Sequence, residues 1–164
     1  MINKRIINIL GYVVLFLGMS MIFSAIWSFI DSSNDLVAII NSSLITSSIG
    51  IFLILITQIK ILKIYPYISL KDTDKVDLSH KDGYTLVTLS WLLMTLFSSL
   101  PFYFYGGPFE NYIDAFFESI SGLTTTGATI LAYDDFSAIP RGLMFWRSFI
   151  QFIGGIGIIV FSIA

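Results

Sequence analysis

Long apolar stretches alternate with short polar segments along the chain. Four stretches contain no charged residue or a single one: residues 6–30, 36–59, 83–104 and 142–164. A helix needs about 20 predominantly apolar residues to cross the hydrocarbon core of a bilayer. The pattern therefore predicts four spanning helices. Only the polar turn 31–35 separates the first two, so we expect them to form an antiparallel hairpin.

A fifth apolar pattern is shorter. Residues 112–123 place apolar side chains at helical spacing, with polar side chains on another face. The apolar set is Ile113, Phe116, Phe117, Ile120 and Leu123, and the polar set is Asp114, Glu118 and Ser121. A helix of this length rises about 18 Å, which is too short to cross a core of about 30 Å. The pattern predicts a helix that enters the membrane, after which the chain turns back.

The turning segment, residues 119–129, reads Ser-Ile-Ser-Gly-Leu-Thr-Thr-Thr-Gly-Ala-Thr. It offers carbonyl and hydroxyl oxygens without charge, and Gly122 and Gly127 permit backbone angles closed to other residues. Irregular backbone is tolerated at membrane depth only where protein buries it or where it lines a water-filled cavity. We interpret the segment as a pore loop that can coordinate a dehydrated cation. An extracellular loop with a Thr-rich turn is the alternative.

Composition places the chain among membrane proteins. Hydrophobic residues make up 55% of the sequence and charged residues 12%, with a mean hydropathy of +0.84, whereas soluble proteins carry about 25% charged residues. The absence of cysteine excludes disulfides and thiolate metal sites, and the single histidine, His80, disfavours a histidine metal site. Because no second His and no Cys could act as base or nucleophile, we predict that the protein is not an enzyme.

Basic residues mark one side of the membrane. Lys4 and Arg5 precede the first stretch and five lysines lie within residues 60–82, whereas residues 31–35 and 105–140 contain no Lys or Arg. Cytoplasmic loops carry the excess of Lys and Arg, so the N terminus and residues 60–82 are predicted to be cytoplasmic. The opposite loops contain seven acids: Asp31, Asp35, Glu110, Asp114, Glu118, Asp134 and Asp135. Such a mouth would concentrate cations; ordinary outer-loop acidity is the alternative.

Two features of the last apolar stretch need an explanation. Arg147 is a charge well inside an apolar run, which is costly unless the charge is paired or hydrated. We expect it to pair with Glu118 or with loop carbonyls, and snorkelling to the outer headgroups is the alternative. Gly154, Gly155 and Gly157 favour close helix packing, since small residues bring membrane helices together; a hinge is the alternative.

Two motifs together resemble a known family. Ser-Gly-Leu-Thr-Thr-Thr-Gly-Ala-Thr at 121–129, followed by Phe-Trp-Arg-Ser-Phe-Ile-Gln-Phe-Ile-Gly-Gly-Ile-Gly-Ile-Ile-Val at 145–160, is similar to the first pore repeat of the Trk/Ktr/HKT superfamily of potassium transporters. The extra helix pair at the N terminus resembles the TrkH type. We therefore expect an all-α polytopic membrane protein with an N-terminal transmembrane hairpin (1–68), a cytoplasmic loop (69–82) and the first helix/pore-loop/helix repeat (83–164).

The resemblance implies potassium uptake across the plasma membrane. One repeat would supply one quarter of a selectivity filter, in which carbonyls of Thr125, Thr126, Gly127 and Ala128 replace the hydration shell of K⁺. Glu118 and Arg147 would support that filter. In the family, glycine at the position of Gly127 goes with potassium and serine with sodium permeability. We also expect any Cβ at Gly127 to crowd the loop.

The resemblance also implies partners. Members have four repeats in one polypeptide, so this chain is expected to be a fragment that joins the remaining pore repeats. A homodimer, a cytosolic nucleotide-binding regulatory subunit and membrane lipid are the expected partners; nucleic acid is not. K⁺ is expected as the transported ion, with no tightly bound cofactor. The alternative function is a non-conducting membrane assembly or scaffold subunit.

The orientation can be tested because the chain has no cysteine. An impermeant thiol reagent applied to intact cells should label Ser33→Cys, in the turn 31–35, but not Ser79→Cys, because only the basic side should face the cytoplasm. Permeabilised cells, in which both should react, provide the control. The reverse labelling pattern would contradict the orientation.

Overall fold

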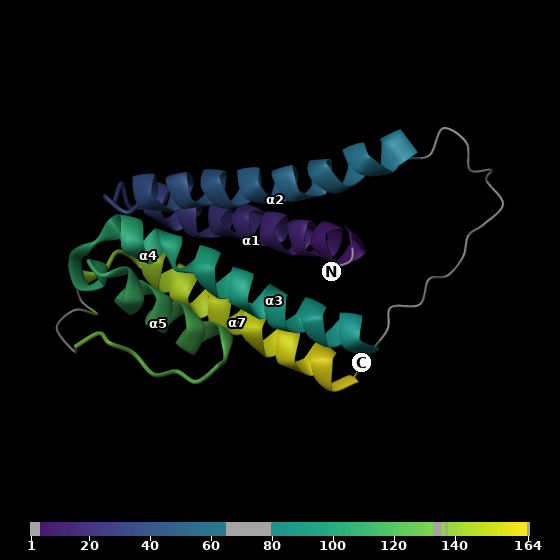
Figure 1. Cartoon of the computed structure of the whole chain (residues 1–164). Helices are drawn as coiled ribbons and strands as arrows, with labels where there is room; N and C mark the ends of the chain where they lie inside the picture. The colour runs from purple at the N-terminus through teal and green to yellow at the C-terminus, as the bar shows by residue number, and fades with distance from the viewer. Residues whose placement is uncertain (1–3, 65–79, 133–135, 137, 164) are drawn as a thin grey trace.

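The computed structural model describes residues 4–64, 80–132, 136 and 138–163 (Figure 1). Its helices are α1 (Lys4–Ile30), α2 (Leu36–Ile64), α3 (His80–Ser98), α4 (Leu100–Tyr105), the 3₁₀ helix η1 (Gly107–Phe109), α5 (Tyr112–Leu123) and α7 (Arg141–Ile163). The described residues contain no strand, which confirms the all-α class. The predicted loop 69–82 lies outside the described residues except for its last three positions, which belong to α3.

Helices α1 and α2 form an antiparallel hairpin that packs along α3 and α7 through α1 (Figure 1). Small residues bring the two hairpin helices together. A Cβ added at Gly18 would lie 2.7 Å from the backbone nitrogen of Ser47, and one at Gly50 would lie 2.8 Å from the Cα of Leu15. The Ser43 hydroxyl donates a hydrogen bond to the Gly18 carbonyl at 2.8 Å. Close backbone approach of this kind is typical of helices packed in a membrane.

Three helical segments among the described residues are long and apolar enough to cross a membrane. They are Lys4–Ile30, Leu36–Gln58 and Lys81–Tyr105, with mean hydropathies of 2.3, 2.1 and 1.5. This agrees with the first three predicted spans. Helix α7 is not among the segments found within the described residues, so a crossing by α7 stays a prediction.

The third predicted helix, 83–104, is not continuous. It begins earlier, at His80, and divides into α3 and α4 at Ser99. Pro101 lies in the first turn of α4, where its missing N–H and its ring are tolerated, whereas in a helix interior they would break the hydrogen-bond ladder. The indole Nε1 of the fully buried Trp146 donates to the Ser98 carbonyl at 2.9 Å, which fixes α7 against this break.

Helix α5 has the predicted bounds but turns its polar side inward. Glu118 and Ser121 are buried at 1% and 4% exposure, whereas Ile113 and Phe117 are 78% and 42% exposed. The reason is steric, since α5 packs closely on α7: a Cβ at Gly122 would lie 2.9 Å from the Ile150 side chain. The small and polar residues therefore face the protein, together with Leu123 at the end of the helix, whereas Ile113 and Phe117 face outward.

The glycines at positions 154, 155 and 157 of α7 are not equivalent. A Cβ at Gly154 would lie 1.9 Å from the carbonyl oxygen of Leu123, the last residue of α5. The neighbours of Gly155 and Gly157 are at ordinary contact distances of 3.9 and 3.7 Å. The packing interpretation therefore holds at Gly154, where α7 approaches the end of α5.

We expect Gly154→Ala to lower the stability of the full-length protein by about 1–3 kcal/mol, because backbone atoms must shift to admit the methyl group. Gly155→Ala is the matched control, since it adds the same methyl group one residue away with room to spare. Thermal unfolding in detergent measures both. Equal melting temperatures for the two variants would rule out the packing role.

Candidate functional site

The chain reverses direction at the end of α5. The amide of Thr125 donates to the Gly122 carbonyl at 2.9 Å, and the amide of Thr126 donates to the Ser121 carbonyl at 3.0 Å. Thr125 and Gly127 have φ angles of +57° and +75°. The left-handed region costs a residue with a Cβ roughly 1–2 kcal/mol, while glycine adopts it freely. Left-handed conformations at alternate residues therefore shape the loop.

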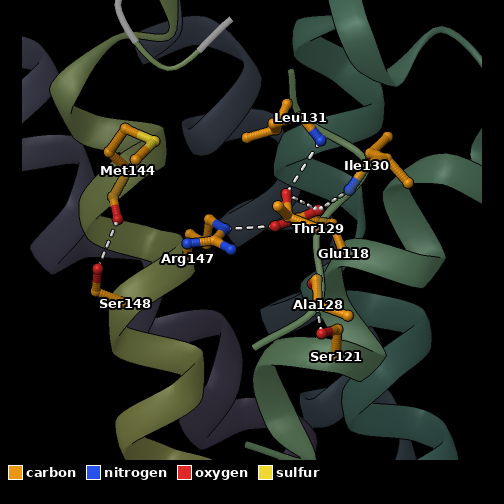
Figure 2. Close-up of polar contacts among 9 residues, drawn as sticks. All are labelled: Glu118, Ser121, Ala128, Thr129, Ile130, Leu131, Met144, Arg147 and Ser148. Atoms are coloured by element: carbon orange, nitrogen blue, oxygen red, sulfur yellow. Dashed lines mark hydrogen bonds and ion pairs between the residues drawn. The ribbon is translucent and has the colours of Figure 1, made fainter. Parts of the chain in front are cut away.

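These angles leave part of the loop backbone accessible. Residues 124–130 are all exposed, and within the described part of the chain no hydrogen bond is formed to the carbonyls of Thr125, Thr126 and Gly127. The Ala128 carbonyl differs, because it accepts a hydrogen bond from the Ser121 hydroxyl at 2.6 Å (Figure 2). Within the described residues, three of the four predicted carbonyls thus accept no hydrogen bond, and the fourth accepts one from α5.

The expected crowding at Gly127 is wrong for this chain. A Cβ built on Gly127 has no heavy atom within 4 Å. The requirement for glycine therefore comes from the φ angle and not from lack of space. Thr125 shows that the loop also holds a β-branched residue in the same region, a feature that no local sequence signal indicates.

A buried carboxylate holds the returning limb of the loop. Glu118 of α5 forms a close ion pair with Nε of Arg147 through Oε1. Its Oε2 accepts hydrogen bonds from the Thr129 hydroxyl at 2.9 Å and from the Ile130 amide at 3.2 Å (Figure 2). The Thr129 hydroxyl also accepts from the Leu131 amide at 3.1 Å. One carboxylate thus connects α5, α7 and the loop.

Arg147 has the acceptor that its position in an apolar run demands. Its side chain is 21% exposed and is directed at Glu118, with the guanidinium 5.7 Å from the centre of the Phe136 ring. This geometry favours pairing over snorkelling.

The sequence analysis did not identify Ser121 and Thr129 as functional residues, although their hydroxyls fix the two limbs of the loop. The one sequence feature that could have indicated them is that a hydroxyl residue stands at each end of the motif 121–129.

The acids predicted for the outer mouth have unequal surroundings. Asp35 and Glu118 are buried, and Asp31 pairs with Arg141 at 3.2 Å. Glu110 and Asp114 are more accessible, while residues 134 and 135 lie outside the described part of the chain. The buried acids act as hydrogen-bond acceptors inside the protein, so they contribute less to a cation-attracting surface than the sequence suggested.

Three helical segments long and apolar enough to cross a membrane, with a short helix and a loop between α4 and α7, define a multi-pass helical membrane protein. A family model described as "TrkH: Cation transport protein" matches residues 48–164. The chain therefore belongs to the TrkH family of cation transport proteins, as the sequence motifs indicated.

Individual relatives agree with this family. The chain is 43% identical over 90 residues to the Trk system potassium uptake protein TrkH of Vibrio parahaemolyticus, covering 55% of this chain and 18% of the relative. It is 39% identical over 89 residues to TrkG of Escherichia coli, covering 54% and 18%. The crystal structure of the potassium transporter TrkH from Vibrio parahaemolyticus matches with a TM-score of 0.81 and 29% identity, over 99% of this chain and 31% of that one. The chain thus spans under a third of these relatives.

Arg147→Gln should lower the stability of the full-length protein by about 3 kcal/mol, because it leaves the Glu118 carboxylate buried without its cation. Combining it with Glu118→Gln should recover part of that loss, since the charge left without a partner is removed as well. Thermal unfolding of both single variants and the double variant measures the coupling. Strictly additive losses would show that the two side chains do not act as a pair.

Proposed function

We propose that the full-length protein takes up potassium across the plasma membrane and that residues 119–129 supply one quarter of its selectivity filter. The observation that carries this proposal is the run of accessible carbonyls at Thr125, Thr126 and Gly127. Rings of backbone carbonyls replace the hydration shell of K⁺ in potassium channels. The relatives are named as potassium uptake proteins, which supports K⁺ as the transported ion.

The electrostatics of α5 favour a cation at this loop. The C-terminal end of a helix carries a negative partial charge, and α5 ends at Leu123, directly before the loop. Ala128 shares its carbonyl between Ser121 and the ion, which fixes the far end of the coordinating segment. Glu118 and Arg147 act as supports: they set the position of Thr129 and Ile130 without touching the ion.

The remaining elements follow from this role. Residues 83–164 form the first helix/pore-loop/helix repeat, after the hairpin 1–68 and a cytoplasmic loop 69–82. The N terminus is cytoplasmic, and the chain joins further pore repeats, a second copy and a cytosolic nucleotide-binding regulatory subunit.

For the thiol-labelling test of this orientation, Asn34→Cys is a better variant than Ser33→Cys. Ser33 is half-buried and its hydroxyl donates a hydrogen bond to Asp35, whereas Asn34 is exposed.

We expect Gly127→Ser in the full-length protein to lower the discrimination between potassium and sodium. A side chain at φ +75° costs roughly 1–2 kcal/mol, so the loop relaxes and its carbonyls move. Rescue of a potassium-uptake-deficient bacterium at limiting potassium, with sodium competition, measures the effect. Thr126→Ala should have a smaller effect, because its carbonyl is retained.

Gly106→Ser is the matched control for Gly127→Ser. Gly106 has the same φ of +75° and no heavy atom within 4 Å of an added Cβ, but it lies after α4, away from the loop. With a ψ of −137°, Gly106 lies in a region that glycine almost alone adopts, so Gly106→Ser should strain the backbone outside residues 119–129 without changing selectivity. If both variants rescue growth and resist sodium as the wild type does, residues 119–129 are an ordinary loop and not part of the filter. A wild type that does not rescue growth would instead favour a non-conducting assembly subunit.

A further inference from the structure

A second buried carboxylate, Asp35, joins the hairpin to α7. Asp35 ends the turn between α1 and α2 and is completely buried. Its Oδ2 accepts hydrogen bonds from the Ser28 hydroxyl at 2.9 Å and from the backbone amide of Leu143 at 3.1 Å. Its Oδ1 accepts one from the Ser33 hydroxyl. Leu143 belongs to α7 and lies 108 residues further along the chain.

Helix α7 needs this contact because its own sequence provides no cap. The carbonyl of Pro140 accepts the Met144 amide at 3.1 Å, so Pro140 occupies the capping position, and its side chain has no acceptor atom. The first amides of a helix have no partner within the helix, and an Asp side chain is among the best acceptors for them. Asp35 supplies that acceptor from the hairpin, with its charge at the favourable end of the helix dipole.

The start of α7 is shaped to receive the hairpin. A Cβ at Gly142 would lie 1.8 Å from the Ser28 hydroxyl and 2.6 Å from Oδ2 of Asp35, so no larger residue fits without displacing them. The Ser24 hydroxyl donates to the Gly142 carbonyl. Ser24 of α1 therefore binds the first turn of α7 directly, whereas Ser28, one turn further on, binds the Asp35 carboxylate that caps this turn.

The capped turn leads directly to the loop. Arg147 follows Leu143 by four residues, about 6 Å along the helix, and its partner Glu118 binds the Ile130 amide. We propose that Asp35 is a positioning residue for the selectivity filter: it sets the position of α7, and through Arg147 and Glu118 it sets the position of the loop. This inference rests on the proposed potassium transport. Asp35 lies before residue 48, where the family match begins.

The test compares two charge-removing substitutions in the same turn of the full-length protein. Asp35→Asn keeps the size of the side chain but places an amide group among three donors. Asp31→Asn is the matched control, because the Asp31 carboxylate pairs with the 66% exposed side chain of Arg141, at the start of α7, and accepts no hydrogen bond from a backbone amide of α7 within the described residues. It also controls for any general effect of removing a negative charge from the outer side.

Uptake of potassium and sodium is normalised to the amount of protein in the membrane. We expect Asp35→Asn to lower the ratio of potassium to sodium uptake by up to about fivefold, the factor that corresponds to the stability of a typical helix cap if all of it acts on the loop. Asp31→Asn should leave the ratio unchanged. A purely structural role would lower the yield or melting temperature of Asp35→Asn and leave the ratio per molecule intact, which would overturn the proposal. An equal change in both variants would overturn it too.

Hydrogen exchange separates this inference from the proposed function. In Asp35→Asn, the amides of residues 141–147 should exchange faster than in the wild type, whether or not the protein transports potassium. A wild type without potassium uptake would refute the proposed function. If the ratio of potassium to sodium uptake changed while amide exchange did not, the cap on α7 could not be the means by which Asp35 acts on the loop.

If Asp35→Asn does not accumulate in the membrane, Ser28→Ala offers a milder change, because it removes only one donor to Asp35. Its uptake ratio should change less and in the same direction, and wild-type behaviour of Ser28→Ala would count against the proposal.

Discussion

The carboxylate of Glu118 is the contact on which the arrangement of the loop depends. A buried charge is tolerated only where ion pairing and hydrogen bonds replace its hydration, and Glu118 obtains these from Arg147, Thr129 and Ile130. One donor comes from α7 and the other two come from the returning limb of the loop. The need to satisfy one charge therefore brings α5, α7 and the returning limb of the loop into a single geometry.

Close packing makes this arrangement possible. Gly122 and Gly154 allow α5 and α7 to approach until backbone atoms touch side chains or other backbone atoms. At that separation, large side chains cannot lie between the helices, so the small and polar face of α5 turns inward and Ile113 and Phe117 turn outward. In water such an arrangement would expose apolar surface at a cost. In a membrane, or against further segments of the same protein, the cost disappears.

Much of this architecture could be predicted from the sequence. Residues 112–123 form a helix with the predicted bounds, because the spacing of the apolar residues and the length of the pattern both indicated it. The cost of an unpaired charge at Arg147 indicated Glu118 as its partner. Other features depend on tertiary contacts that no local pattern encodes. The left-handed Thr125 contradicts the preference of a β-branched residue. The sequence grouped Asp35 with the accessible acids of the outer side, since only the folded chain brings Leu143 to it.

The distance along the chain between Asp35 and its amide partner has a consequence for biosynthesis. A ribosome adds roughly 5–20 residues per second, so the 108 residues that separate Asp35 from Leu143 take about 5–20 s to appear. During that interval the hairpin can already be inserted, and among the described residues of the hairpin only Ser28 and Ser33 donate hydrogen bonds to the Asp35 carboxylate. The set of hydrogen bonds to Asp35 is therefore incomplete until α7 is synthesised and the Leu143 amide reaches the carboxylate.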